Sequence, residues 1–168
     1  MENETFNDSN YTNFNRDSQR PTFLIVLCVL SAIAIISNVF STVSAILDST
    51  DVTIQIETAM EQIEDTDGIP ENMLEDFKQY TITSINNFKV INTVNLILYL
   101  LEGWAVLMMF NLKKTGYWIY LACQVGFILS IFLFYPSNNF ITSILIGYTI
   151  IASGLFAILY GTNLKYLK

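Results

Sequence analysis

Long apolar runs dominate this chain, and short polar segments separate them. The four runs cover about residues 22–47, 88–111, 117–135 and 140–161, and their hydrophobicity is continuous rather than alternating. Each is long enough to cross the hydrocarbon core of a bilayer as a helix, which takes about 20 residues. The pattern predicts an all-α fold, a four-transmembrane-helix bundle that forms one membrane domain over residues 21–168.

The segment from 48 to 87 is polar but keeps a helical period. Apolar residues recur at helical spacing on both sides of Asp67-Gly68-Ile69-Pro70, a sequence typical of a turn. Pro70 suits the first position of the helix that follows. We therefore expect helices 1 and 2 to extend beyond the membrane as an acidic extracytoplasmic helical hairpin. Its surface is either a solvated charged face or a docking surface for an external partner or cation.

The first residues form a polar tail. Residues 1–20 are rich in Asn, Asp, Ser and Thr and contain few aliphatic side chains. Such a segment cannot bury enough apolar surface to fold by itself. It is predicted to be a disordered cytoplasmic tail.

The formal net charge of −7 conceals a segregation of charge along the chain. Acidic residues concentrate between 48 and 87. Paired basic residues stand at three other sites: Arg16 and Arg20, Lys113 and Lys114, and Lys165 and Lys168. Positive charge beside a span marks the cytoplasmic side of a membrane. All three sites agree if both termini are cytoplasmic and the acidic segment is external.

Composition excludes several classes of function. The chain is 52% hydrophobic and contains no histidine, which removes histidine-ligated metals and histidine-based catalysis. Cys28 and Cys123 lie within apolar runs, so no external disulfide is expected. The basic residues come in isolated pairs, unlike the patches that bind nucleic acid. No cofactor and no metal site are predicted.

A polar stripe interrupts the second span. Asn92, Asn95, Tyr99 and Glu102 are spaced by three, four and three residues, which places them on one helix face. Glu102 is the acidic residue within the apolar runs, and a charge near the bilayer centre costs roughly 2.5–3.5 kcal/mol on insertion scales. Its expected partners from other helices are Asn38, Tyr120 and Gln124.

Two interpretations of Glu102 follow from this cost. In the first, the carboxyl is neutral and hydrogen-bonded inside the bundle, which is the hypothesis we adopt for the isolated sequence. In the second, Glu102 handles protons or cations, or docks another subunit.

Small residues mark a second face, in the fourth span. Gly147, Gly154 and Gly161 are seven residues apart. In lipid, a face of small residues allows two helix backbones to approach closely. The spacing predicts a helix-packing face. In the first span, Asn38 is expected to form a hydrogen bond across the bundle.

The turn between the second and third spans carries a resemblance. The residues from Leu112 to Tyr120, LKKTGYWIY, resemble a turn in small bacterial four-span membrane proteins, most of them uncharacterised. These proteins have a lysine pair, then a glycine, then aromatic residues that open the third helix. The resemblance implies a bacterial inner membrane and no particular activity.

These observations favour a non-enzymatic accessory or interaction subunit. It would bind partners through the acidic hairpin and the polar stripe. Besides the lipid bilayer, we expect another membrane protein or a second copy as partner, and no nucleic acid. The alternative is a small oligomeric transporter or channel in which Glu102 handles protons or cations. An intramembrane aspartyl protease would need two acids in the spans, and the runs contain one.

The predicted topology can be tested by labelling single cysteines in a variant without Cys28 and Cys123. Thr66→Cys should react with a membrane-impermeant thiol reagent in intact cells, whereas Ser9→Cys should react only after permeabilisation. Labelling of Ser9→Cys alone in intact cells would reverse the orientation.

Overall fold

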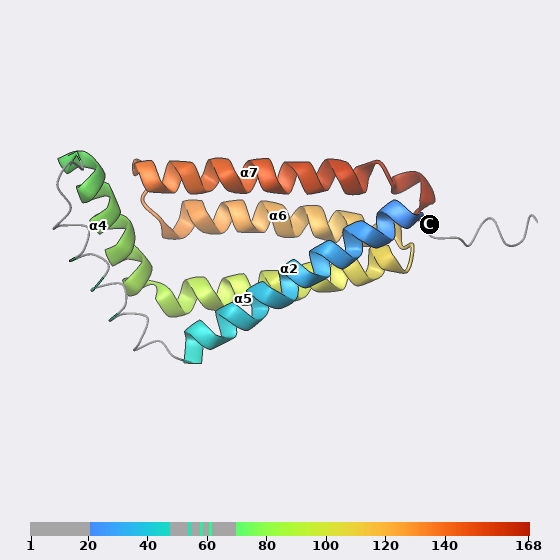
Figure 1. Cartoon of the computed structure of the whole chain (residues 1–168), viewed down its shortest axis with the longest axis horizontal. Coiled ribbons are helices and arrows are strands. Elements are labelled where there is room, and N and C mark those ends of the chain that lie inside the picture. The colour runs from blue at the N-terminus through green and yellow to red at the C-terminus, as the bar shows by residue number, and fades with distance from the viewer. Residues whose placement is uncertain (1–20, 48–53, 55–57, 59–60, 62–69) are drawn as a thin grey trace, which may run out of the picture.

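The computed structural model describes residues 21–47, 54, 58, 61 and 70–168. Over this part of the chain the structure is helical: α2 (Thr22–Leu47), α4 (Glu71–Asn86), α5 (Phe88–Phe110), α6 (Lys114–Phe134), α7 (Phe140–Gly161) and a 3₁₀ turn, η1 (Leu164–Tyr166). Figure 1 shows α2, α5, α6 and α7 running along the molecule, with α4 across one end. The predicted tail, 1–20, and most of the acidic segment, 48–69, lie outside the described residues.

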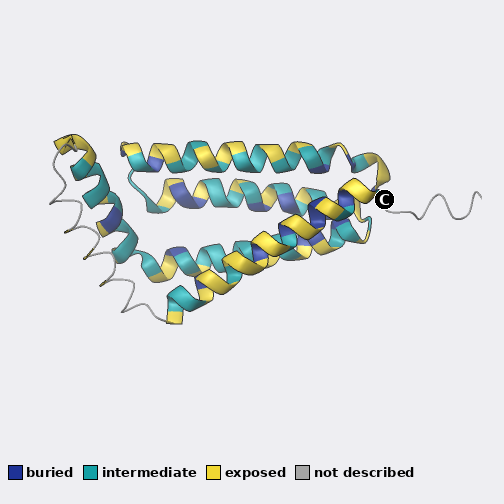
Figure 2. Ribbon diagram, viewed as in Figure 1, coloured by how far each residue is buried: buried dark blue, intermediate teal, exposed yellow. Residues whose placement is uncertain are grey.

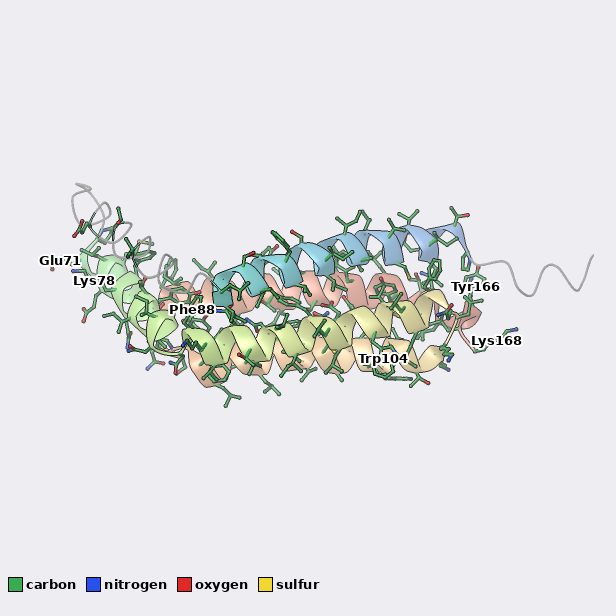
Figure 3. The ribbon with its side chains drawn as sticks, turned by 90° about the horizontal axis from the view of Figure 1, so that it is seen from below. Glu71, Lys78, Phe88, Trp104, Tyr166 and Lys168 are labelled. Carbon is green, nitrogen blue, oxygen red and sulfur yellow. The ribbon has the colours of Figure 1, made fainter. Side chains whose placement is uncertain are left out.

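The four long helices confirm the predicted spans. Each is long and apolar enough to cross a membrane. Large apolar side chains point away from the bundle, such as Phe40 (74% exposed), Leu133 (77%) and Trp104 (65%), the last of which is labelled in Figure 3. Contiguous apolar surface of this extent is rare on soluble proteins, whereas lipid is a suitable solvent for it. The chain has the character of an integral membrane protein.

The turn before α6 is tighter than the sequence suggests. α6 begins at Lys114, three residues before the predicted boundary at 117. The chain reverses at Leu112, whose φ of 60° is uncommon for a residue with a side chain. Two backbone hydrogen bonds stabilise this conformation: Lys168 N–H donates to Leu112 C=O (2.6 Å), and Lys114 N–H donates to Lys168 C=O (2.8 Å).

The helix before the second span is present, but it is a separate element. α4 ends at Asn86, and Asn87 (φ −104°, ψ 9°) separates it from α5. The two helices therefore point in different directions, as Figure 1 shows. Pro70 is the N-cap of α4 rather than its first helical residue. The prediction was wrong by one position because the extended ψ of Pro70, 136°, precedes the first helical turn.

Contacts with α7 hold α4 across the end of the bundle. The Asn139 side-chain amide donates to the Asp76 carbonyl, and Phe140 N–H donates to Asp76 Oδ2 (2.9 Å). The rings of Tyr80 and Tyr135 are stacked, with centroids 4.9 Å apart. α4 thus connects α5 to the first turn of α7. We name this end of the molecule the α4 end.

The opposite end, which carries Lys113, Lys114, Lys165 and Lys168, is named the basic end. Most of the core lies there: Leu24, Leu27, Cys28, Ala105, Val106, Met109 and Tyr160 are all at most 3% exposed. Figure 2 shows the buried positions of α2 gathered toward this end. α5 packs closely against α2 and α6, whereas α2 and α7 touch at few positions. The bundle is therefore closed at the basic end.

The prediction that Gly147, Gly154 and Gly161 form a helix-packing face is wrong within one chain, except at Gly161. A Cβ atom built on Gly147 or Gly154 would meet nothing within 4 Å. Only at Gly161 is a neighbour close, with the Tyr117 hydroxyl 3.3 Å from the Cβ position. The physical reason is rotation: the opposite face of α7, with Thr149 and Ser153, lines the bundle interior. Gly116 has the tightest contacts instead, because its Cβ would lie 2.6 Å from the Ala105 carbonyl oxygen.

We expect Gly116→Ala to lower the free energy of unfolding by roughly 1–3 kcal/mol, since the added methyl group would force α5 and α6 apart. Gly154→Ala is the matched control and should be neutral or slightly stabilising, because alanine has the higher helix propensity. Thermal unfolding in detergent measures both. Equal melting temperatures for the two variants would contradict the close approach at Gly116.

Candidate functional site

The polar stripe of α5 faces the interior, as its spacing predicts. Asn95, Tyr99 and Glu102 line one cavity. Asn92 lines a second, adjoining cavity, where its side-chain amide donates to the Phe88 carbonyl (2.8 Å). The structure therefore brings three of the four stripe residues together and places the fourth beside them.

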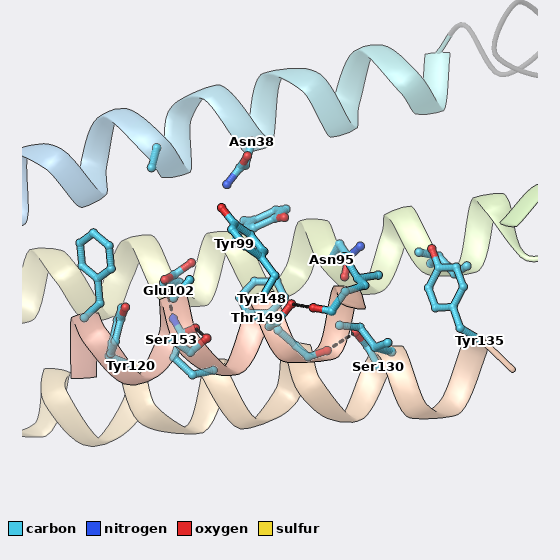
Figure 4. Close-up of a pocket in the computed structure, with 18 residues that line it drawn as sticks. Asn38, Asn95, Tyr99, Glu102, Tyr120, Ser130, Tyr135, Tyr148, Thr149 and Ser153 are labelled. Atoms are coloured by element: carbon cyan, nitrogen blue, oxygen red, sulfur yellow. Dashed lines mark hydrogen bonds between the residues drawn. The ribbon is translucent and has the colours of Figure 1, made fainter. Parts of the chain in front are cut away.

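The first cavity, named the central cavity, has a volume of about 400 Å³. Its lining comes from all four spans, with Asn38 on α2, Glu102 on α5, Gln124 on α6 and Ser153 on α7. Figure 4 shows these helices around it, with α2 on one side of the opening. The cavity exists because α2 and α7 meet at the basic end and diverge toward the α4 end (Figure 1).

A chain of hydrogen bonds crosses three helices at Glu102. The Gln124 Nε2 amide donates to Glu102 Oε1 (2.7 Å), and the Ser153 hydroxyl donates to Gln124 Oε1 (2.6 Å). Among the expected partners of Glu102, Gln124 is thereby confirmed. We name Glu102, Gln124 and Ser153 the polar chain.

The second carboxyl oxygen of Glu102 opens into the central cavity. The described residues donate no hydrogen bond to it, and Thr142 Oγ1 is the only fully buried side-chain oxygen or nitrogen among them that lacks a partner. Glu102 Oε2 is therefore not sealed within the protein, and the space that Glu102 lines is the central cavity. One oxygen is held by Gln124, and the other has no hydrogen-bond partner among the described residues.

Tyr120 and Asn38 lie at the cavity without bonding to Glu102. Tyr120 is 3% exposed, and its ring packs at a tilt against Tyr160, with centroids 5.1 Å apart. Asn38 is exposed, and its side chain forms no hydrogen bond with the described residues. The predicted hydrogen bond of Asn38 across the bundle is not formed among the described residues, at a level where α2 diverges from α7 (Figure 1).

Aromatic and polar groups close the basic end of the cavity. The Tyr160 hydroxyl donates to Ser31 Oγ (2.8 Å), which joins α7 to α2. Tyr160 is fully buried. Tyr120 and Tyr160 together fill the space between Glu102 and the basic end. Within the described residues, the central cavity is therefore closed at its basic end.

The adjoining cavity lies beneath α4 and has a volume of about 390 Å³. It shares Ile91, Asn95 and Tyr135 with the central cavity, so the two are neighbours. Burial, together with the adjacent Tyr135, raises the pKa of the Tyr80 hydroxyl in its wall to about 12. Tyr80 therefore stays neutral at physiological pH. The lining of this cavity is uncharged among the described residues.

The sequence analysis missed Ser153 and Thr149. They are four residues apart on α7 and line the central cavity. Their spacing on one helix face was the available signal. The described residues contain no group of three His, Cys, Asp or Glu side chains that could hold a metal ion.

The polar chain predicts a clear difference between two substitutions. Glu102→Leu should lower the free energy of unfolding by roughly 1–3 kcal/mol, because it leaves the Gln124 amide without its acceptor. Glu102→Gln should be nearly neutral, since an amide oxygen can accept the same hydrogen bond. Equilibrium unfolding in detergent can compare them, and equal losses would show that the bond to Gln124 contributes nothing to stability.

No protein-family model, curated protein or solved structure matches the chain. Function must therefore be inferred from the cavity, its carboxyl group and the exposed helix faces.

Proposed function

We propose that this protein is a non-enzymatic integral membrane carrier that binds a small cation, or exchanges a proton, at Glu102. One observation carries the proposal: Glu102 presents an oxygen to a cavity that all four spans line. Ionisable residues within spans usually mark an ion, proton or substrate pathway.

The cavity also changes which of the two candidate functions is favoured. The sequence alone favours an interaction subunit, because four spans leave little room for a private pathway. A volume of about 400 Å³ within one chain lies in the range of small-molecule sites, roughly 300–1,000 Å³. A single copy therefore has room for a ligand beside Glu102.

A carrier fits the closed basic end better than an open channel. A channel needs a continuous path, whereas Tyr120, Tyr160 and Ser31 form contacts between Glu102 and the basic end. A carrier binds its ligand from one side at a time and changes conformation to release it. The few contacts between α2 and α7 would allow such a change.

The orientation follows from the charge pattern. With the basic end and both termini in the cytoplasm, the central cavity approaches the external side through the space beneath α4. We place the protein in a bacterial inner membrane, as the resemblance at residues 112–120 implies. In this orientation the cavity takes up its ligand from outside.

An interaction subunit is the second candidate, and a different observation favours it. Gly147 and Gly154 have no neighbour within 4 Å of their Cβ positions, so this face of α7 is open to a helix of another membrane protein or of a second copy. A stoichiometric protein retained through purification without crosslinking would support this candidate.

Infrared difference spectroscopy tests whether Glu102 exchanges its proton. For the carrier, a protonated-carboxyl band that is absent from Glu102→Gln should lose intensity as pH is raised, because Oε2 reaches the cavity. The protein is purified in detergent and kept folded throughout the titration, which circular dichroism verifies.

A Glu102-dependent band that persists at every pH at which the protein stays folded would overturn the carrier. Glu102 would then be a neutral structural group, as the sequence alone suggests. Glu75→Gln is the matched control, because Glu75 lies on α4 outside the spans and its loss should leave the band unchanged.

A further inference from the structure

We propose that the ligand of the central cavity is an organic ammonium cation, held between the Glu102 carboxylate and aromatic rings. This inference rests on the proposed function and names its class of ligand. It is based on the charge of the lining, on the atoms that surround Glu102 and on the aromatic residues beside it.

The charge of the lining sets the charge of the ligand. Among the described residues that line the central cavity, Glu102 is the only one with an ionisable carboxyl or amino group. An anion would meet no basic partner, and a divalent cation would keep an uncompensated charge. A monovalent cation leaves the site neutral once Glu102 is ionised, which is the least costly arrangement in a membrane interior.

The atoms around Glu102 do not suit a bare metal ion. Hard cations require about six oxygen ligands, but Gln124 presents its NH₂ group to Glu102 rather than its oxygen. The Gln124 oxygen accepts the Ser153 hydroxyl proton instead. The Gln124 oxygen is therefore already occupied and is not offered as a metal ligand. An organic ammonium ion needs no such set of oxygen ligands and can pair with Glu102 Oε2 alone.

Aromatic side chains complete the site. Tyr99 lies one helical turn before Glu102, and its ring packs against Phe127 with centroids 4.9 Å apart. Tyr148 also lines the cavity and is 71% exposed. Figure 4 shows Tyr99, Tyr148 and Glu102 around the same space. Aromatic faces attract organic cations, and desolvation strengthens that attraction.

Binding then requires an exchange of charge. If Glu102 is protonated when the cavity is empty, its O–H bond breaks as the ammonium ion enters, and the proton leaves to water on the α4 side. One positive charge enters and one leaves, so the membrane interior stays neutral. Gln124 remains the donor to Oε1 in both states.

Isothermal titration calorimetry with tetraethylammonium tests this inference on the full chain in detergent. Saturable binding is expected, with release of about one proton per cation when the buffers differ in ionisation enthalpy. An equal concentration of sodium should not compete. The neutral, similarly branched alcohol 3-ethyl-3-pentanol should bind at least about tenfold more weakly.

Two variants separate the carboxyl from the rings. Glu102→Gln should weaken tetraethylammonium binding by at least about tenfold, whereas Tyr148→Leu should weaken it by about 2- to 30-fold, the range that loss of one cation–π contact gives. Tyr148 is mostly exposed, so its replacement should leave the melting temperature unchanged. Ile151→Leu, at a position that is 73% exposed and outside the cavity lining, is the control.

Folded wild-type protein that shows no saturable tetraethylammonium binding would overturn the inference. So would equal binding by Glu102→Gln, or equal binding of the neutral alcohol. The proposed function is tested separately by the infrared titration. If the Glu102 band titrates but tetraethylammonium does not bind, the protein remains a candidate proton or inorganic-cation carrier, and only the ammonium inference is overturned. A Glu102 band that never titrates would overturn both the proposed function and the ammonium inference.

Discussion

The hydrogen bond from Gln124 to Glu102 is the interaction on which the interior of this protein depends. A carboxyl group within a span is costly unless it is paired, and this bond, continued by Ser153, satisfies one oxygen while joining α5, α6 and α7. Buried polar networks are favourable only when their members are satisfied. Gln124 uses its donor toward Glu102 and its acceptor toward Ser153, which fixes its orientation and leaves Glu102 Oε2 toward the cavity.

The first span, α2, is not part of this network, and the shape of the cavity follows from that. α2 packs along α5 and is tied to α7 through Ser31 and Tyr160 at the basic end. No equivalent polar bond joins α2 to α7 near Asn38 among the described residues. The two helices diverge there, and the central cavity occupies the space between them. The basic end of the bundle is thus a closely packed core, and the polar cavity lies toward the α4 end.

α4 adds a boundary to the open end. The contacts of Asp76 with Asn139 and Phe140, and the stack of Tyr80 on Tyr135, attach α4 to both ends of the α6–α7 turn. The adjoining cavity beneath α4 shares residues with the central one. Apart from Glu102, the described residues that line the two cavities carry no charge.

By itself the sequence determined the spans, the inward polar stripe and the need of Glu102 for a polar partner, with Gln124 as one of three candidates. These follow from rules that act locally or through the solvent: an apolar run of span length must lie in lipid, and a buried carboxyl must find a polar partner. Only the tertiary structure decided which face of each helix meets which neighbour. It turned Gly147 and Gly154 outward and left Asn38 without a hydrogen-bond partner among the described residues. It also placed the Ser153 hydroxyl beside Gln124. The sequence of a helix shows which residues share a face, but not which way that face points within a bundle. The rotation of each helix is set by the simultaneous packing of all the helices.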